Sequence, residues 1–275
     1  MAVSGRAVKR AAARFGDSEW VERMGRLGLV AKGISFGIVG VLAILLALGV
    51  GGTATDRPGA FRYLAQEPYG AVLLFALGLG FGAYAMWRFA QAVLDRDDEG
   101  EDFKGWAKRS GCLAKGLFYA GLSVLAFSFV TGPRGESASE PERTARVFEY
   151  PAGRWAVGLL GLGLIGYGLW NGYRSMSGKY LKHMREGKME REDVRPLVKL
   201  VGFLGHLARM FLFTIVGVFL VRAAYQYDAK EAIGIDGALA KIAHQPFGPL
   251  WLTGVAAGLF AYGLFSVAQA RYRDI

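Results

Sequence analysis

The sequence predicts an all-α membrane protein with six transmembrane helices, arranged as three tandem helical-hairpin repeats with pseudo-threefold symmetry about the membrane normal. Three observations predict it: apolar residues gather in six blocks, charged residues lie between the blocks, and one motif recurs three times. Of the 275 residues, 53% are hydrophobic, 20% are charged and 40 are glycine. A soluble domain would carry about a quarter charged residues. Cys112 is the only cysteine, which excludes a disulfide scaffold.

Each of the six apolar blocks is long enough for a helix that crosses the hydrocarbon core, which takes about 20 residues. Glycine inside the blocks is compatible with helices, because lipid-facing backbone must be satisfied within its own segment and neighbouring helices approach closely at glycine. The blocks are Leu27–Val50, Gly70–Leu94, Gly111–Thr131, Arg154–Tyr173, Leu200–Val221 and Phe247–Ala270.

The distribution of Lys and Arg predicts that both termini are cytoplasmic. The N-terminal segment, the second and fourth loops and the C-terminal tail together carry 19 of these residues, whereas the opposite loops carry 7. Loops rich in Lys and Arg stay on the cytoplasmic side. Residues 1–27 lack the apolar core of a cleaved signal peptide. We interpret them as a basic tail on an anionic membrane surface, with a transit sequence as the alternative.

The motif that recurs has the form P-x-G-x9-G-x3-Y-x2-[W/F], with identical spacing in all three copies. A period of this kind indicates three equivalent structural units. The copies comprise Pro68, Gly70, Gly80, Tyr84 and Trp87; Pro151, Gly153, Gly163, Tyr167 and Trp170; and Pro246, Gly248, Gly258, Tyr262 and Phe265.

A second motif precedes each copy. "GLVAKG" at Gly28–Gly33 matches "GCLAKG" at Gly111–Gly116, and we align "GFLGHL" at Gly202–Leu207 as a degenerate third copy. Short segments with helical spacing, "AFRYLAQE", "TARVFEY" and "ALAKIAHQ", stand before the three Pro-x-Gly motifs, and we expect amphipathic helices on the outer surface. The predicted organisation is a cytoplasmic basic segment 1–22, repeat 1 at 23–95, repeat 2 at 106–175, a charged cytoplasmic linker 176–196 and repeat 3 at 197–272.

The two motifs together resemble those of a bacterial six-helix membrane family, domain-of-unknown-function family 1206. The resemblance covers the chain from about Val21 to Tyr272. It implies three tandem two-helix repeats in the bacterial cell (inner) membrane, and it implies no activity. Mitochondrial carriers share a threefold topology, but their odd helices carry a Pro-x-acid signature that this chain lacks.

The predicted spans contain no Asp or Glu, since all 23 acidic residues lie in loops or tails. Buried carboxylates are the usual proton relays and cation ligands of membrane proteins, so we expect neither function. Paired intramembrane histidines and metal-ligand clusters are also missing, and we expect no metal, no cofactor and no enzymatic activity. Because the basic residues flank apolar spans, nucleic acid is not an expected partner.

Basic residues remain inside the spans. Lys32, Lys115 and His206 are aligned at equivalent repeat positions near the cytoplasmic ends of the odd helices. Arg209 follows His206 by three residues, and Arg88 lies near the cytoplasmic end of an even helix. One interpretation is a basic ring around the pseudo-threefold axis, which binds an anion or an anionic head group. The alternative is that these side chains extend to interfacial phosphates. We interpret the signature tyrosines as packing residues, and Trp87 and Trp170 as part of an aromatic belt.

Two functions compete at this stage. The first is a channel- or transporter-like protein for a small anionic or neutral solute, since repeat symmetry is frequent in transporters. The alternative is a non-transporting module that binds anionic lipid or a membrane-protein partner, supported by the charged fourth loop. The expected partners are the lipid bilayer, anionic lipids in particular, and a membrane protein or a second copy of the chain.

Overall fold

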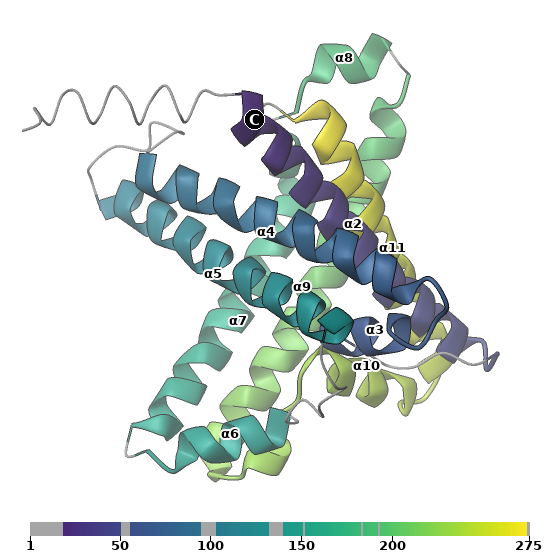
Figure 1. Ribbon diagram of the computed structural model, residues 1–275. Coiled ribbons are helices and arrows are strands. Elements are labelled where there is room, and N and C mark those ends of the chain that lie inside the picture. Colours follow the sequence, from purple (N-terminus) through teal and green to yellow (C-terminus); the bar gives the residue numbers. More distant parts are fainter. Residues whose placement is uncertain are drawn as a thin grey trace, which may run out of the picture. The chain divides into compact units, whose positions relative to one another are not determined.

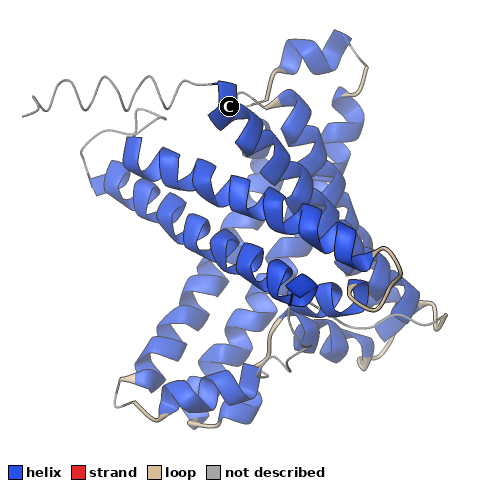
Figure 2. Cartoon of the chain, in the orientation of Figure 1, coloured by secondary structure: helices blue, strands red, loops and turns tan. Residues whose placement is uncertain are grey.

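The computed structural model describes residues 19–50, 56–94, 103–131, 140–150, 152–182, 184–191 and 193–273. Its elements are helices joined by short loops (Figure 2). The predicted basic segment 1–22 lies almost wholly outside the described residues, as does Pro151.

Six long helices of the described ranges occupy the six apolar blocks. They are α2 (Glu19–Ala47), α4 (Gly70–Leu94), α5 (Phe103–Thr131), α7 (Gly153–Ser177), α9 (Arg195–Gln226) and α11 (Gly248–Tyr272). Within the described residues, five of them are long and apolar enough to cross a membrane, and α7 is not among the five. Helix α7 has the length, 25 residues, but its glycines and its Asn171 lower the hydropathy. The structure thus supports five candidate spans, and the sixth stays a prediction.

Short helices precede the second, the fourth and the sixth of the predicted spans. They are α3 (Arg57–Leu64), α6 (Glu140–Phe148) and α10 (Ile235–Ala243), as the helical spacing predicted. Further short elements flank α9: η1 (Lys179–Leu181), α8 (Glu186–Arg191) and η2 (Ala229–Glu231).

The glycine of each Pro-x-Gly motif begins a long helix and is required there for steric reasons. Gly70, Gly153 and Gly248 each donate the backbone N–H to the carbonyl oxygen three residues earlier, at 2.9, 2.9 and 2.7 Å. A Cβ at any of these positions would overlap a carbonyl oxygen of the preceding short helix, namely that of Leu64, Val147 or Ala243. The motif therefore encodes the same tight turn three times.

The chain divides into two compact units, and α2, α3 and α11 each contribute residues to both. Unit 1 contains the described residues 19–32, 61–94, 103–131 and 266–273, and unit 2 contains 33–50, 56–60, 140–150, 152–182, 184–191 and 193–265. Repeat 2 is divided between them, since α5 belongs to unit 1 and α7 belongs to unit 2.

In unit 1, α4 and α5 run side by side (Figure 1). Gly78 of α4 lies under the ring of Phe127, where an added Cβ would stand 3.0 Å from the ring, and the Gly78 carbonyl accepts a hydrogen bond of 2.7 Å from Ser123. The first part of α2 packs on α4 through the repeat residues, because Gly28 lies directly beneath Tyr84. Small residues at these contacts thus allow α2, α4 and α5 to pack closely.

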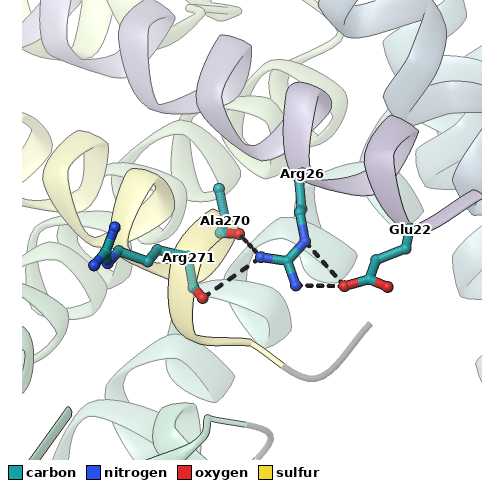
Figure 3. A network of polar contacts seen from close by, with 4 residues as sticks. All are labelled: Glu22, Arg26, Ala270 and Arg271. Atoms are coloured by element: carbon teal, nitrogen blue, oxygen red, sulfur yellow. Dashed lines mark hydrogen bonds and ion pairs between the residues drawn. The ribbon is translucent and has the colours of Figure 1, made fainter. Parts of the chain in front are cut away.

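The C-terminal end of α11 is also fixed within unit 1 (Figure 3). Arg26 of α2 donates to the carbonyl oxygen of Ala270 at 2.7 Å and reaches that of Arg271 at 3.5 Å. The same guanidinium pairs with Glu22 one turn earlier on α2. A cation that binds the last carbonyl groups of a helix satisfies acceptors that have no partner within the helix, so α2 caps the C-terminal end of α11.

In unit 2, α7 and α9 run side by side (Figure 1). Their backbones meet at Gly161 and Gly217, where an added Cβ on Gly161 would stand 2.8 Å from the Gly217 carbonyl oxygen. Helix α9 also packs on α11, with Gly205 against Tyr262. The core of this unit is thus built around glycines that leave room for a neighbouring helix.

Candidate functional site

The most deeply placed cation described in unit 2 is Arg209, a residue of α9 with a side chain that is only 8% exposed. Its guanidinium donates hydrogen bonds to the hydroxyl groups of two signature tyrosines, Tyr262 and Tyr167. The guanidinium carbon also lies 4.3 Å from the ring centroid of Tyr262 and 5.3 Å from that of Phe213. Aromatic faces and hydroxyl oxygens therefore stabilise a charge that would be costly in lipid.

A second arginine approaches this cluster through Phe36. The guanidinium carbons of Arg57 and Arg209 lie 4.2 and 5.8 Å from the Phe36 ring centroid. The two carbons are therefore no more than about 10 Å apart, and both side chains are buried. Arg57 is the first residue of α3, where Asp56 caps the helix by accepting 2.9 Å hydrogen bonds from Gly59 and Ala60.

The chemistry of this Arg209 cluster favours an anion. A tyrosine hydroxyl that accepts from a guanidinium keeps its own O–H as a donor. Arg209, Tyr167 and Tyr262 thus join one guanidinium to two phenol hydroxyl groups. The predicted spans supply no carboxylate, and Arg209 itself carries a positive charge.

His206 lies beside the same tyrosine and is buried. Its ring contacts Tyr262 edge-on at 5.4 Å and stacks on Tyr180 of η1 at 5.2 Å. Its Nδ1 is 2.8 Å from the carbonyl oxygen of Gly202. Tyr180 donates its hydroxyl to the carbonyl of Lys199 at 2.9 Å, and burial raises the pKa of that hydroxyl. The predicted cytoplasmic linker is thus packed onto repeat 3.

Unit 1 contains a related cluster at Arg88. Its guanidinium donates to the hydroxyl of the signature Tyr84 at 2.6 Å and to Oε1 of Gln91 at 2.8 Å. The guanidinium carbon also lies 4.4 Å from the ring centroid of Trp87. All three signature tyrosines therefore accept a hydrogen bond from an arginine, which is a role that the sequence did not reveal. The rings of Tyr84 and Tyr262 also pack on glycines, Gly28 and Gly205, as predicted.

The remaining members of the predicted ring lie in unit 1. Lys32 of α2 is buried, whereas Lys115 of α5 is exposed. Arg209 and His206 both contact Tyr262 within unit 2. The structure thus brings those two residues together, and the convergence of all five predicted residues on one axis stays a prediction.

The contacts of repeat 3 correct our alignment of its first motif. Gly28 lies under Tyr84 in repeat 1, and the residue that lies under Tyr262 in repeat 3 is Gly205, three residues after the predicted Gly202. "GHLAR" from Gly205 therefore matches "GLVAK" from Gly28 and "GCLAK" from Gly111. The repeat equivalent of Lys32 and Lys115 is Arg209 and not His206.

The signature residues of repeats 1 and 3 are more deeply buried than those of repeat 2. Tyr84, Trp87, Tyr262 and Phe265 are each at most 4% exposed, whereas Trp170 is 52% exposed. The prediction of an aromatic belt is therefore wrong for Trp87, which is 1% exposed because Tyr84 and the guanidinium groups of Arg88 and Arg273 surround its ring.

Sequence reasoning missed Arg57, Phe36 and Tyr180. Arg57 had one signal, its place directly before Pro-Gly at a helix start, but its contact with Phe36 depends on tertiary structure. Among the residues that the structure describes, no group of three or more His, Cys, Asp or Glu is placed to hold a metal ion.

Comparisons with known proteins agree with the repeat structure. A sequence model of the family described as Domain of Unknown Function (DUF1206) matches residues 27–95, 110–178 and 204–273. The chain is 34% identical over 256 residues to an uncharacterized protein, YxxB, of Bacillus subtilis (strain 168), a match that covers 93% of this chain and 92% of that protein. No solved structure matches the chain. The start of the third match also places Arg209 in line with Lys32 and Lys115.

Proposed function

Since the chain belongs to the DUF1206 family, whose description names no activity, we propose from its own residues that it is a channel- or transporter-like membrane protein for a small anionic solute. The proposal includes six spans with α7 as the sixth, a pseudo-threefold arrangement of the repeats, and both termini in the cytoplasm of a bacterial cell. It also includes the absence of enzymatic activity.

The observation that carries the proposal is the buried guanidinium of Arg209. An ionised side chain within a membrane span is costly, and such residues generally mark a substrate or ion path. Here two tyrosine hydroxyls and several rings hold the guanidinium in place. A neutral solute is a weaker candidate, because a guanidinium attracts a group with negative charge.

The test is anion flux in liposomes that contain the purified protein, measured for chloride, nitrate and a short carboxylate. We expect flux above that of empty liposomes, and we expect Arg209→Gln to reduce it at least about tenfold, since removing one partner of a charged hydrogen bond costs about 1.5–3 kcal/mol. Arg222→Gln is the matched control, because Arg222 lies on the same helix but is exposed and pairs with Glu231 at 3.2 Å. Equal flux for wild type and Arg209→Gln would contradict the proposal.

A second candidate function is a module that binds anionic lipid, and the linker supports it. Tyr180, Leu181, Met184 and Met189 are buried, which fixes this segment on unit 2. Its exposed basic residues are Lys179, Lys182, Arg185 and Lys188. Basic clusters beside a membrane attract anionic lipids by about 1 kcal/mol per residue near the surface.

Lipid retention and anion flux, measured in liposomes of different composition, distinguish the two functions. If the lipid-binding function is correct, neutralising Lys179, Lys182 and Lys188 together weakens retention of phosphatidylglycerol, and liposomes with wild-type protein show no anion flux. If the transport function is correct, the same triple variant retains anion flux in neutral liposomes.

A further inference from the structure

Two buried N–H groups of unit 1 lack an acceptor among the described residues. Nε1 of Trp87 and Nε of Arg88 are both shielded from solvent, and neither has a hydrogen-bond partner there. Leaving a buried donor unsatisfied is costly, and such groups in a native protein usually indicate a water, an ion or a ligand. The two donors belong to neighbouring residues of α4, and Trp87 is 1% exposed.

The surroundings of these donors are cationic. The guanidinium carbons of Arg88 and Arg273 lie 4.4 and 5.4 Å from the ring centroid of Trp87. The hydroxyl of Tyr84 and Oε1 of Gln91 already accept from the other two nitrogens of Arg88. A group that satisfies either of the two remaining donors must therefore be an acceptor, and the positive charge of Arg88 favours a negative one.

We propose that Trp87, Arg88 and Arg273 form a binding site for a phosphate-type oxyanion in unit 1, separate from the Arg209 cluster of unit 2. A tetrahedral oxyanion offers several acceptor oxygens to donors that point from different directions, and arginine is a common phosphate ligand. The site stands near the end of α4 and just past the end of α11, the ends predicted to face the cytoplasmic membrane surface. Lipid head-group phosphates and free cytoplasmic phosphate are both present there.

The internal repeats show that this site is particular to repeat 1. At the position of Trp87, repeat 2 has Trp170, which is 52% exposed, and repeat 3 has Phe265, which is fully buried. At the position of Arg88, the other repeats have Asn171 and Ser266. The fold therefore accommodates a buried phenylalanine at this position, and the indole N–H and the guanidinium are additions that packing alone does not require.

The repeats also supply the variants for a test. Trp87→Phe removes the unsatisfied indole N–H and installs the residue that repeat 3 already buries. Trp170→Phe is the same change at the exposed equivalent and serves as the control. Arg88→Gln removes the second donor and the charge. The thermal midpoint of each variant without added anion shows whether it is folded.

The experiment uses the full chain in dodecyl maltoside micelles, which contain no phosphate. The midpoint of thermal unfolding is followed as inorganic phosphate, phosphatidylglycerol or phosphate-free diacylglycerol is added at constant ionic strength. Ligands that bind the native state raise this midpoint. We expect a rise with one of the two phosphate compounds and none with diacylglycerol. A rise with inorganic phosphate identifies a free oxyanion, and a rise with phosphatidylglycerol alone identifies a lipid head group.

We expect Trp87→Phe to weaken the apparent affinity about tenfold and Arg88→Gln to weaken it further, because a hydrogen bond to a charged group is lost in each. Trp170→Phe should bind as the wild type does. The proposal is overturned if neither phosphate compound raises the midpoint, in which case water satisfies the donors, or if Trp87→Phe and Trp170→Phe bind alike. The readout is binding, so its outcome is independent of anion flux through Arg209.

Discussion

Repeats 1 and 3 use their common motif in one way, and repeat 2 uses it in another. In repeats 1 and 3 the first-motif glycine lies beneath the signature tyrosine, as with Gly28 under Tyr84, and the tyrosine is buried. In repeat 2, a Cβ added at Gly111 or Gly163 would meet no described atom of another element within 4 Å, and Tyr167 is partly exposed. The helices α5 and α7 instead pack along α4 and α9. The motif thus fixes the local turn and presents a glycine face, but other residues decide which helix covers that face.

The largest effect is expected where all three repeats are the same. Gly70→Ala, Gly153→Ala and Gly248→Ala should each destabilise the protein by about 3 kcal/mol, because the added Cβ overlaps a backbone carbonyl and the turn must open. The measurement is the unfolding midpoint of each purified variant. A repeat 2 variant that is as stable as the wild type would show that its turn is not equivalent to the other two.

The next effect should separate repeat 2 from the others. Gly28→Ala and Gly205→Ala should each cost about 1–3 kcal/mol, because the methyl group has no space beside Tyr84 or Tyr262. Gly111→Ala should be neutral or stabilising by about 1 kcal/mol, since alanine favours helix and nothing described stands within 4 Å. Equal losses of unfolding free energy at all three sites would remove the distinction between the repeats.

Removing single hydroxyl groups tests the arginine contacts. Tyr84→Phe and Tyr262→Phe should each cost about 1.5–3 kcal/mol, because a buried guanidinium loses an acceptor. Tyr167→Phe should cost less, about 1 kcal/mol, since its contact is partly exposed. Chemical denaturation of the three variants gives the ranking, and a larger loss for Tyr167→Phe than for Tyr262→Phe would contradict it.

The smallest effect concerns the linker, which joins repeats 2 and 3. Burial raises the pKa of Tyr180 above its ordinary value of 10.0, so the folded protein favours the neutral phenol. The resulting stability is fully present below pH 10.0 and is lost as the pH rises through the higher pKa. Phenolate absorbance of the wild type minus that of Tyr180→Phe should therefore titrate above pH 10.0. A difference that titrates below it would show that Tyr180 is not buried in solution.

The sequence predicted most of the fold and less of the site. The apolar blocks, the Pro-x-Gly turns and the short helices before them depend on local chemistry, and each is found where the pattern placed it. The degenerate third motif misled the alignment, because "GFLGHL" and "GHLARM" overlap in the sequence and only the contact between Gly205 and Tyr262 distinguishes them. Arg209 was among the candidate basic residues, but its partners were not identified.

Those partners could not be predicted because they come from distant segments. Tyr167 and Tyr262 are 42 and 53 residues from Arg209, and the Phe36 ring that contacts the guanidinium groups of Arg57 and Arg209 comes from the first long helix. A hydropathy pattern specifies which residues avoid water or lipid. It does not specify which buried donor contacts which buried acceptor, since that depends on which helices are neighbours in the folded protein.

The capping of α11 by Arg26 also constrains how the protein is made. The two partners lie 244 and 245 residues apart, and a ribosome produces the chain from its N-terminal end. During synthesis Arg26 therefore has no contact with the end of α11 until Ala270 and Arg271 have been made, whereas Glu22 lies only one turn away on α2. A chain that is cut before Ala270 therefore leaves α2 without this partner.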